Sequence, residues 1–166
     1  IKRVLVEFVL QKKVISQRFW PGLMHAFVFW GFMFFSIITL DHFSIGFHAH
    51  LLSDNFKFFY GILFGVPWAI FVLVGISSLT YRRFIIRPKY LGDKISYTSG
   101  FVALFISVLM ITYIIDYVYV GHHSTNLAMK INWWIHAILI LGFLILIPRS
   151  KHLHLVLSPI NIFFKP

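Results

Sequence analysis

Four long apolar segments alternate with short polar ones along this chain of 166 residues. The pattern predicts helices over about 22–43, 56–79, 97–120 and 131–148, each near the length of about 20 apolar residues that crosses a bilayer. Backbone groups inside a bilayer must be hydrogen-bonded within the protein, so helices are the expected structure. We therefore expect an all-α fold, an integral membrane four-helix bundle.

The two ends of the chain show other patterns. Apolar side chains near the N-terminus fall on one side of a helix: Val4, Leu5, Phe8 and Val9. With basic groups elsewhere on its surface, the segment 1–20 is predicted to be an amphipathic helix lying at the membrane surface. Residues 149–166 are predicted to be an extension on the same side. We interpret 1–166 as a single membrane domain that belongs to a longer chain or complex.

The net charge of +10 is unevenly distributed, and its placement predicts the topology. Basic residues gather before the first span, between the second and third, and after the fourth: Lys2, Arg3, Lys12, Lys13, Arg18, Arg82, Arg83, Arg87, Lys89, Lys94, Arg149, Lys151 and Lys165. Cytoplasmic loops carry the excess of Lys and Arg, so both termini are predicted to be cytoplasmic. This segregation favours a lipid bilayer over nucleic acid as the partner.

Cysteine is absent from the sequence. Iron–sulfur clusters are held by cysteine thiolates, so no such cluster is expected within these residues. Any cluster that works with this domain must belong to a partner or to another part of the polypeptide.

Four of the nine histidines fall at the ends of predicted spans, where ionisable groups are costly and usually functional. His25 and His42 stand at the two ends of the first span, and His136 and His154 at the start of the last span and beyond it. Because these spans run in opposite directions, His25 shares a membrane side with His154, and His42 shares the other with His136. Eighteen residues of helix cover about 27 Å in five whole turns. His136 and His154 would thus point the same way if the helix continued through Pro148.

Two imidazole pairs on opposite membrane sides are the ligands that two b-type haems need. Iron held by two neutral imidazoles has no free axial position, which favours electron transfer. The seventeen residues from His25 to His42 make about 4.7 turns, which rotates His42 by about 100°. We expect two haem b groups, or one if His42 is not a ligand. Arg18, Arg149 and Lys151 are placed either to pair with propionates of the inner haem or only to fix topology.

Two other classes of function compete with this hypothesis. A haem-free membrane anchor would use the histidines only in packing and would hold a soluble oxidoreductase at the membrane. A small transporter would need polar side chains along a helix face at midplane, and these spans offer almost none. The five-turn spacing of His136 and His154 favours haem over the anchor.

The end of the fourth span resembles a known family. WWIHAILILGFLILIPRSKHLHLV followed by LSPINIFFKP is similar to the membrane cytochrome b domain of the nitrate reductase gamma superfamily. It is more similar to the membrane part of heterodisulfide-reductase-like iron–sulfur oxidoreductases of the electron-transfer-flavoprotein:menaquinone oxidoreductase type. The segments PGLMHAFVFWGF, in the first span, and YRRFIIRP, in the connection that follows the next span, resemble the same group. The resemblance covers most of the chain, and SKHLH with its tail is the most specific part.

The resemblance implies site residues position by position. His136 and His154 match the two haem ligands of the last span, and His25 matches the first ligand of the early span. The family's other early ligand would stand ten residues after His25, where this chain has Phe35. His42 as the fourth ligand therefore rests on geometry alone.

The resemblance also implies partners. In the fused relatives a cysteine-rich cytoplasmic domain carries iron–sulfur clusters and meets a soluble carrier such as an electron-transfer flavoprotein. The implied role is a dihaem electron-transfer module, part of a quinone-linked oxidoreductase, passing electrons between that partner and menaquinone in the inner membrane of a prokaryote. Asp41 and Asp116, near the outer span ends, would either exchange protons with the quinone or serve as interfacial side chains.

Overall fold

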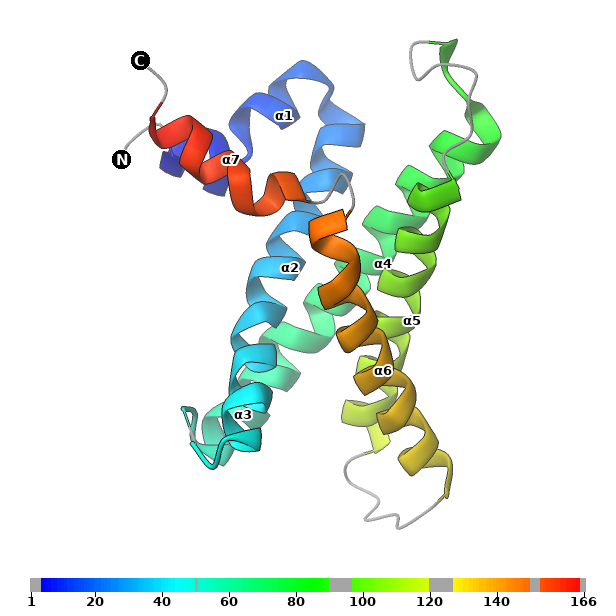
Figure 1. The fold of residues 1–166 in the computed structure, drawn as a ribbon. Coiled ribbons are helices and arrows are strands. Elements are labelled where there is room, and N and C mark those ends of the chain that lie inside the picture. The colour runs from blue at the N-terminus through cyan, green and yellow to red at the C-terminus, as the bar shows by residue number, and fades with distance from the viewer. Residues whose placement is uncertain (1–3, 50, 90–96, 120–126, 150–152, 165–166) are drawn as a thin grey trace.

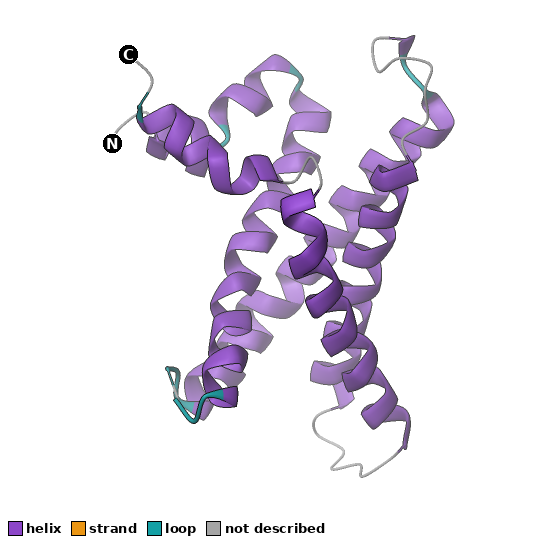
Figure 2. Cartoon of the chain, in the orientation of Figure 1, coloured by secondary structure: helices purple, strands orange, loops and turns teal. Residues whose placement is uncertain are grey.

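The computed structural model describes residues 4–49, 51–89, 97–119, 127–149 and 153–164. Every regular element in these ranges is helical (Figure 2). The long helices cross one another: α4 runs from beside α5 at one end of the molecule towards α3 at the other, and the short helices α1 and α7 lie at the same end (Figure 1). The expected all-α class is confirmed.

Four helical segments are long and apolar enough to cross a membrane, by length and composition. They are α2 (Phe19–Gly46), a composite segment (Asp54–Ile86), α5 (Tyr97–Tyr119) and α6 (Leu127–Arg149). The first and fourth extend past the predicted boundaries by up to four residues, and the second continues seven residues beyond its predicted end, to Ile86. Apolar periodicity weakens at the interface while the backbone hydrogen bonds continue, so the sequence pattern marks helix ends poorly.

The composite segment alternates between α-helical and π-helical turns. It consists of α3 (Asp54–Tyr60), η2 (Gly61–Gly65), α4 (Val66–Tyr81) and η3 (Arg82–Ile86). Ser53 begins it as an N-cap, its side chain accepting the amide of Phe56. A π-helical turn bonds residues five apart instead of four, which changes the direction of the side chains that follow. This change of direction matters at η3, which reaches the end of the bundle where α1 lies.

The N-terminal segment is not one amphipathic helix but two short ones, η1 (Val4–Val9) and α1 (Lys12–Gln17). Gln11 divides them, since its backbone is left-handed (φ 52°) and its side-chain amide donates to the carbonyl of Phe8 at 2.6 Å. The indole of Trp30 donates to the carbonyl of Val9 at 2.6 Å, and the rings of Phe8 and Phe29 lie 4.9 Å apart. These contacts hold η1 against α2.

The condition under which His136 and His154 would point the same way, one helix continuing through Pro148 to His154, is not met. Helix α6 does include Pro148, but it ends at Arg149, and His154 begins a separate helix, α7 (His154–Phe163). Helix α7 is amphipathic, whereas the apolar side chains of α6 are not confined to one side. Helix α7 runs across the end of the bundle against η1 (Figure 1).

Helix packing proceeds from neighbour to neighbour: α2 on α4, α4 on α5, and α5 on α6. A cluster of buried side chains lies between α4 and α5 and consists of Ala69, Val72, Leu109, Met110 and Tyr113. Gly75 lets α2 and α4 approach closely, because a Cβ there would lie 2.7 Å from the carbonyl oxygen of Met24. Helix α6 is the least covered span, with 6% of its most apolar 18 residues buried against 28% in each of the others.

Charge distinguishes the two ends of the bundle. We call the end where α2 begins and η3 finishes the basic end, because Arg18, Arg82 and Arg83 lie there. We call the opposite end the acidic end, because it holds Asp41, Asp54 and Asp116.

Candidate functional site

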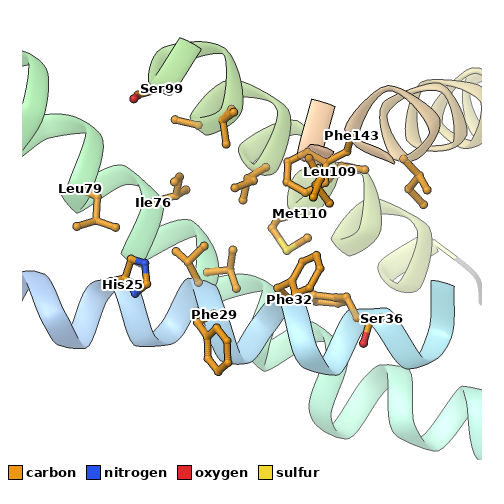
Figure 3. Close-up of a pocket in the computed structure, with 18 of the residues that line it drawn as sticks. His25, Phe29, Phe32, Ser36, Ile76, Leu79, Ser99, Leu109, Met110 and Phe143 are labelled. Atoms are coloured by element: carbon orange, nitrogen blue, oxygen red, sulfur yellow. The ribbon is translucent and has the colours of Figure 1, made fainter. Parts of the chain in front are cut away.

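A cavity of about 520 Å³ lies among α2, α4, α5 and α6 and is lined at one end by His25 and His154. We call it the basic-end cavity. Figure 3 shows His25 projecting into it from α2, at the end where Leu79 and Ser99 also lie, with Ser36 towards the other end. Its volume falls in the range of roughly 300–1,000 Å³ typical of cofactor and ligand sites. Most of its wall is apolar, as expected for a site that excludes water.

His25 and His154 come from helices far apart in the sequence, yet their rings lie close together. The ring centroids are 6.3 Å apart and the ring planes are inclined by 33°. Imidazole nitrogens bind metal ions at about 2.0–2.1 Å, so two rings on opposite sides of one metal ion have centroids about 6 Å apart. The observed spacing fits that arrangement. It also exceeds the separation of two rings in direct stacking contact.

The number of histidines indicates which kind of metal group fits. Within the described ranges, no three His, Cys, Asp or Glu side chains gather closely enough to hold a metal ion by themselves. A pair of imidazoles is the protein's share of a haem site, since the porphyrin supplies the other four nitrogens. The pair at the basic end therefore fits a haem better than it fits a bare metal ion.

A second cavity of about 500 Å³, the acidic-end cavity, is lined by both His42 and His136. It lies between α2, α5 and α6, and Thr112, Tyr113, Asp116, Tyr117 and Asn132 contribute polar groups to its wall. The structure thus places the second predicted histidine pair on the wall of one cavity. About 25 Å of helix separates His25 from His42 along α2, which accounts for their lining different cavities.

His136 is held by a buried polar network between α5 and α6. Its Nδ1 lies 2.8 Å from the hydroxyl oxygen of Thr112, which also lies 2.9 Å and 3.0 Å from the carbonyls of Val108 and Leu109. A hydroxyl has one hydrogen, so when Thr112 donates it to either carbonyl, His136 Nδ1–H donates to Thr112. Nε2 then keeps its lone pair, which is the tautomer a metal ligand needs.

Asn132 strengthens the same network. Its side-chain amide donates to the carbonyl of Thr112 at 3.0 Å, and both residues are buried. One turn of α6 separates Asn132 from His136, so both reach the same stretch of α5. Thr112 and Asn132 were not predicted from the sequence as part of the site. For Asn132 a signal was available, because it is a polar residue one helical turn before the predicted ligand His136.

Two of the three predicted cationic residues can be located in the described part of the chain. Arg18 and Arg149 are exposed at the basic end and line neither cavity. Lys151 lies outside the described residues. The basic-end cavity instead contains Arg83, which the sequence placed in a connection and assigned to topology.

The two acidic candidates have different surroundings. Asp41 is fully buried, accepts the amide of Leu52 at 2.9 Å and pairs with Lys57 Nζ at 3.4 Å. Lys57 also pairs with Asp54 at 2.8 Å. Asp41 is therefore engaged in joining α2 to the start of the second span. Asp116, by contrast, is half-buried and lines the acidic-end cavity.

The fold and site together define a helical membrane protein whose histidines line two cavities. No family model matches the chain, and no solved structure matches it. It is 28% identical over 185 residues to the probable iron-sulfur-binding oxidoreductase FadF of Bacillus subtilis (strain 168), an alignment covering 93% of this chain and 25% of that protein. It is 23% identical over 183 residues to the EtfAB:quinone oxidoreductase of Syntrophomonas wolfei subsp. wolfei (strain DSM 2245B / Goettingen), covering 87% of this chain and 25% of that one.

The chain thus spans about a quarter of the length of both relatives. Their similarity supports a distant relationship to an oxidoreductase family with iron–sulfur and quinone-linked members, in agreement with that part of the predicted resemblance. Neither relative bears on the nitrate reductase gamma superfamily, so membership there stays a prediction.

Proposed function

We propose that this chain is a b-type haem module that carries electrons between an iron–sulfur partner and the quinone pool. The observation that supports this proposal best is the close approach of His25 and His154 at one end of the basic-end cavity, with 6.3 Å between their ring centroids. The names of the relatives support the redox partners, since one is called iron-sulfur-binding and the other a quinone oxidoreductase. When bound, the haem iron supplies reversible one-electron transfer.

Each histidine has a defined task in this proposal. His25 from α2 and His154 from α7 would hold one haem at the basic end. His42 and His136 would hold the other at the acidic end, where Thr112 fixes the tautomer and orientation of His136. The apolar walls of the cavities exclude water and so help to set the reduction potential.

The proposal also assigns an orientation and partners. By the positive-inside rule, the basic end faces the cytoplasm of a prokaryote, where the iron–sulfur partner and an electron-transfer flavoprotein would lie. Menaquinone would exchange electrons near the acidic end, with Asp116 as a group able to exchange protons.

Cysteine labelling tests the orientation. Because the chain has no cysteine, a single cysteine that replaces His48 or Lys89 can be labelled from either side of sealed vesicles. Labelling of the Lys89 position from the periplasmic side would overturn the orientation.

Haem content tests the central claim. The purified chain in lipid nanodiscs is expected to give a reduced-minus-oxidised b-type spectrum, and pyridine haemochrome analysis should give two haems per chain. One haem would restrict the proposal to the basic-end pair. None would refute haem binding and favour the haem-free anchor.

Single substitutions assign the haems to their ligands. His25→Ala and His154→Ala are expected to lose the same haem, and His42→Ala and His136→Ala the other. His48→Ala is the matched control, because His48 is exposed in a connection and lines neither cavity. Loss of the same haem from His25→Ala and His136→Ala would contradict the pairing.

A further inference from the structure

Arg83 is the group at the basic-end cavity that the proposed function does not use. It belongs to η3 and lines the cavity together with His25 and His154. Its Nε is buried and, among the described residues, has no hydrogen-bond partner. A buried guanidinium nitrogen without a partner is costly, and the cost is larger for a charged group than for a neutral one.

The position of Arg83 follows from the π-helical turn. Helix α4 passes directly into η3, where Arg82 and Arg83 are adjacent, and only Arg83 of the two lines the cavity. Arg87 ends the turn in a left-handed conformation (φ 46°), with its own Nε donating to the carbonyl of Phe84 at 2.7 Å. The turn is thus fixed at its end, and Arg83 is directed inwards.

The rest of the wall shows which ligand chemistry Arg83 suits. Within the described part of the chain, Arg83 is the one Lys or Arg that lines this cavity, and no Asp or Glu lines it. Hydroxyl groups of Thr80 and Ser99 line the cavity as well. A positive charge without an acidic neighbour, beside hydroxyl groups and largely apolar walls, suits an anionic group on an otherwise apolar ligand. Guanidinium groups bind carboxylates through two parallel hydrogen bonds.

We propose that Arg83 binds a carboxylate of the cofactor held by His25 and His154. This inference rests on the proposed function, because haem b is an apolar macrocycle with two propionate carboxylates on one edge. Arg83 would then set the direction in which that edge points, towards the basic end. Its charge also disfavours the oxidised, more positive state of the iron, so it raises the reduction potential of this haem.

A redox titration tests this role by a property other than activity. In an His136→Ala background, which isolates the basic-end haem, Arg83→Gln is expected to lower the midpoint potential. Loss of one positive charge at the effective dielectric of a partly buried site should change the reduction equilibrium about tenfold, which is about 59 mV for one electron. Arg83→Lys keeps the charge and is expected to retain most of the potential. Lys89→Gln is the charge-matched control from the same connection and should leave it unchanged.

A second measurement isolates the carboxylate. Apoprotein is titrated with haem and with haem dimethyl ester, which lacks the negative charges. The unsubstituted chain should prefer haem about tenfold or more, the worth of a charge-assisted hydrogen bond. Arg83→Gln should remove that preference without changing the bis-histidine spectrum.

The outcomes separate this inference from the function on which it rests. Failure of the unsubstituted chain to bind haem refutes both. Haem binding with an unchanged midpoint potential in Arg83→Gln, or equal affinity of the unsubstituted chain for haem and its ester, refutes the role of Arg83 alone. The ester comparison in the unsubstituted chain stays decisive if Arg83→Gln does not fold.

Discussion

Replacing Thr112 with valine tests how the acidic-end cavity orients His136. The side chain of Thr112 is 5% exposed and its hydroxyl oxygen lies 2.8 Å from Nδ1 of His136. Valine keeps the shape and removes the hydroxyl. When a metal-bound histidine loses the group that hydrogen-bonds its other ring nitrogen, metal binding weakens about 10–100-fold. The loss of one hydrogen bond between membrane helices costs only about 0.6 kcal/mol on average.

The two magnitudes predict that Thr112→Val affects cofactor binding more than folding. We expect haem at the acidic end to transfer about 10–100-fold more readily to an excess of a scavenging haem protein, with the basic-end haem unaffected. Stability in a denaturing detergent titration should fall by about 1 kcal/mol or less. Thr112→Ser restores the hydroxyl and should restore haem retention. Equal retention in Thr112→Val and the unsubstituted chain would refute the reasoning.

Three further substitutions test the fold. Gly75→Ala should destabilise the chain by about 1–3 kcal/mol in equilibrium unfolding, because the added Cβ would lie 2.7 Å from a backbone carbonyl oxygen of α2. Gly46→Ala is the control and should leave the stability unchanged, because no atom lies within 4 Å of the added Cβ. Asp41→Asn should accelerate proteolysis between α2 and α3, because it removes the buried carboxylate that pairs with Lys57; unchanged cleavage would contradict this. Tyr60→Phe should cost about 0.5–1.5 kcal/mol, measured by the same unfolding titration, since its hydroxyl donates to a carbonyl of α2 at 3.1 Å.

The number and order of the membrane spans were predictable because hydropathy responds directly to the bilayer. The break at Gln11 was not, since a left-handed residue other than glycine gives no sequence signal. The same holds for η2 and η3, whose π-helical turns contain ordinary apolar and basic residues. Both kinds of irregularity are set by tertiary contacts.

The site was predictable to a smaller extent. Opposite span directions group His25 with His154 and His42 with His136, an argument that needs only the topology. Each of these pairs lines one cavity of the structure, and their role as haem ligands stays a prediction. His136 and His154 lie on separate helices, yet the ring of His154 still lies close to that of His25, because α7 begins at the basic end. Arg83 lines the cavity because it lies in the π-helical turn η3. A helical wheel assumes 3.6 residues per turn and therefore does not predict the direction of this side chain.

The loose attachment of α6 has a consequence for the life of the protein in the cell. Helices α2 and α6 face each other across two cavities, and α6 is packed mainly on α5. On the proposed function, the haems fill the space where other bundles have interlocking side chains, so cofactor binding adds directly to the free energy of folding. Cellular haem supply would then control the abundance of the protein as well as its redox state. Chains made during haem shortage would reach the membrane and be removed by proteolysis before they matured.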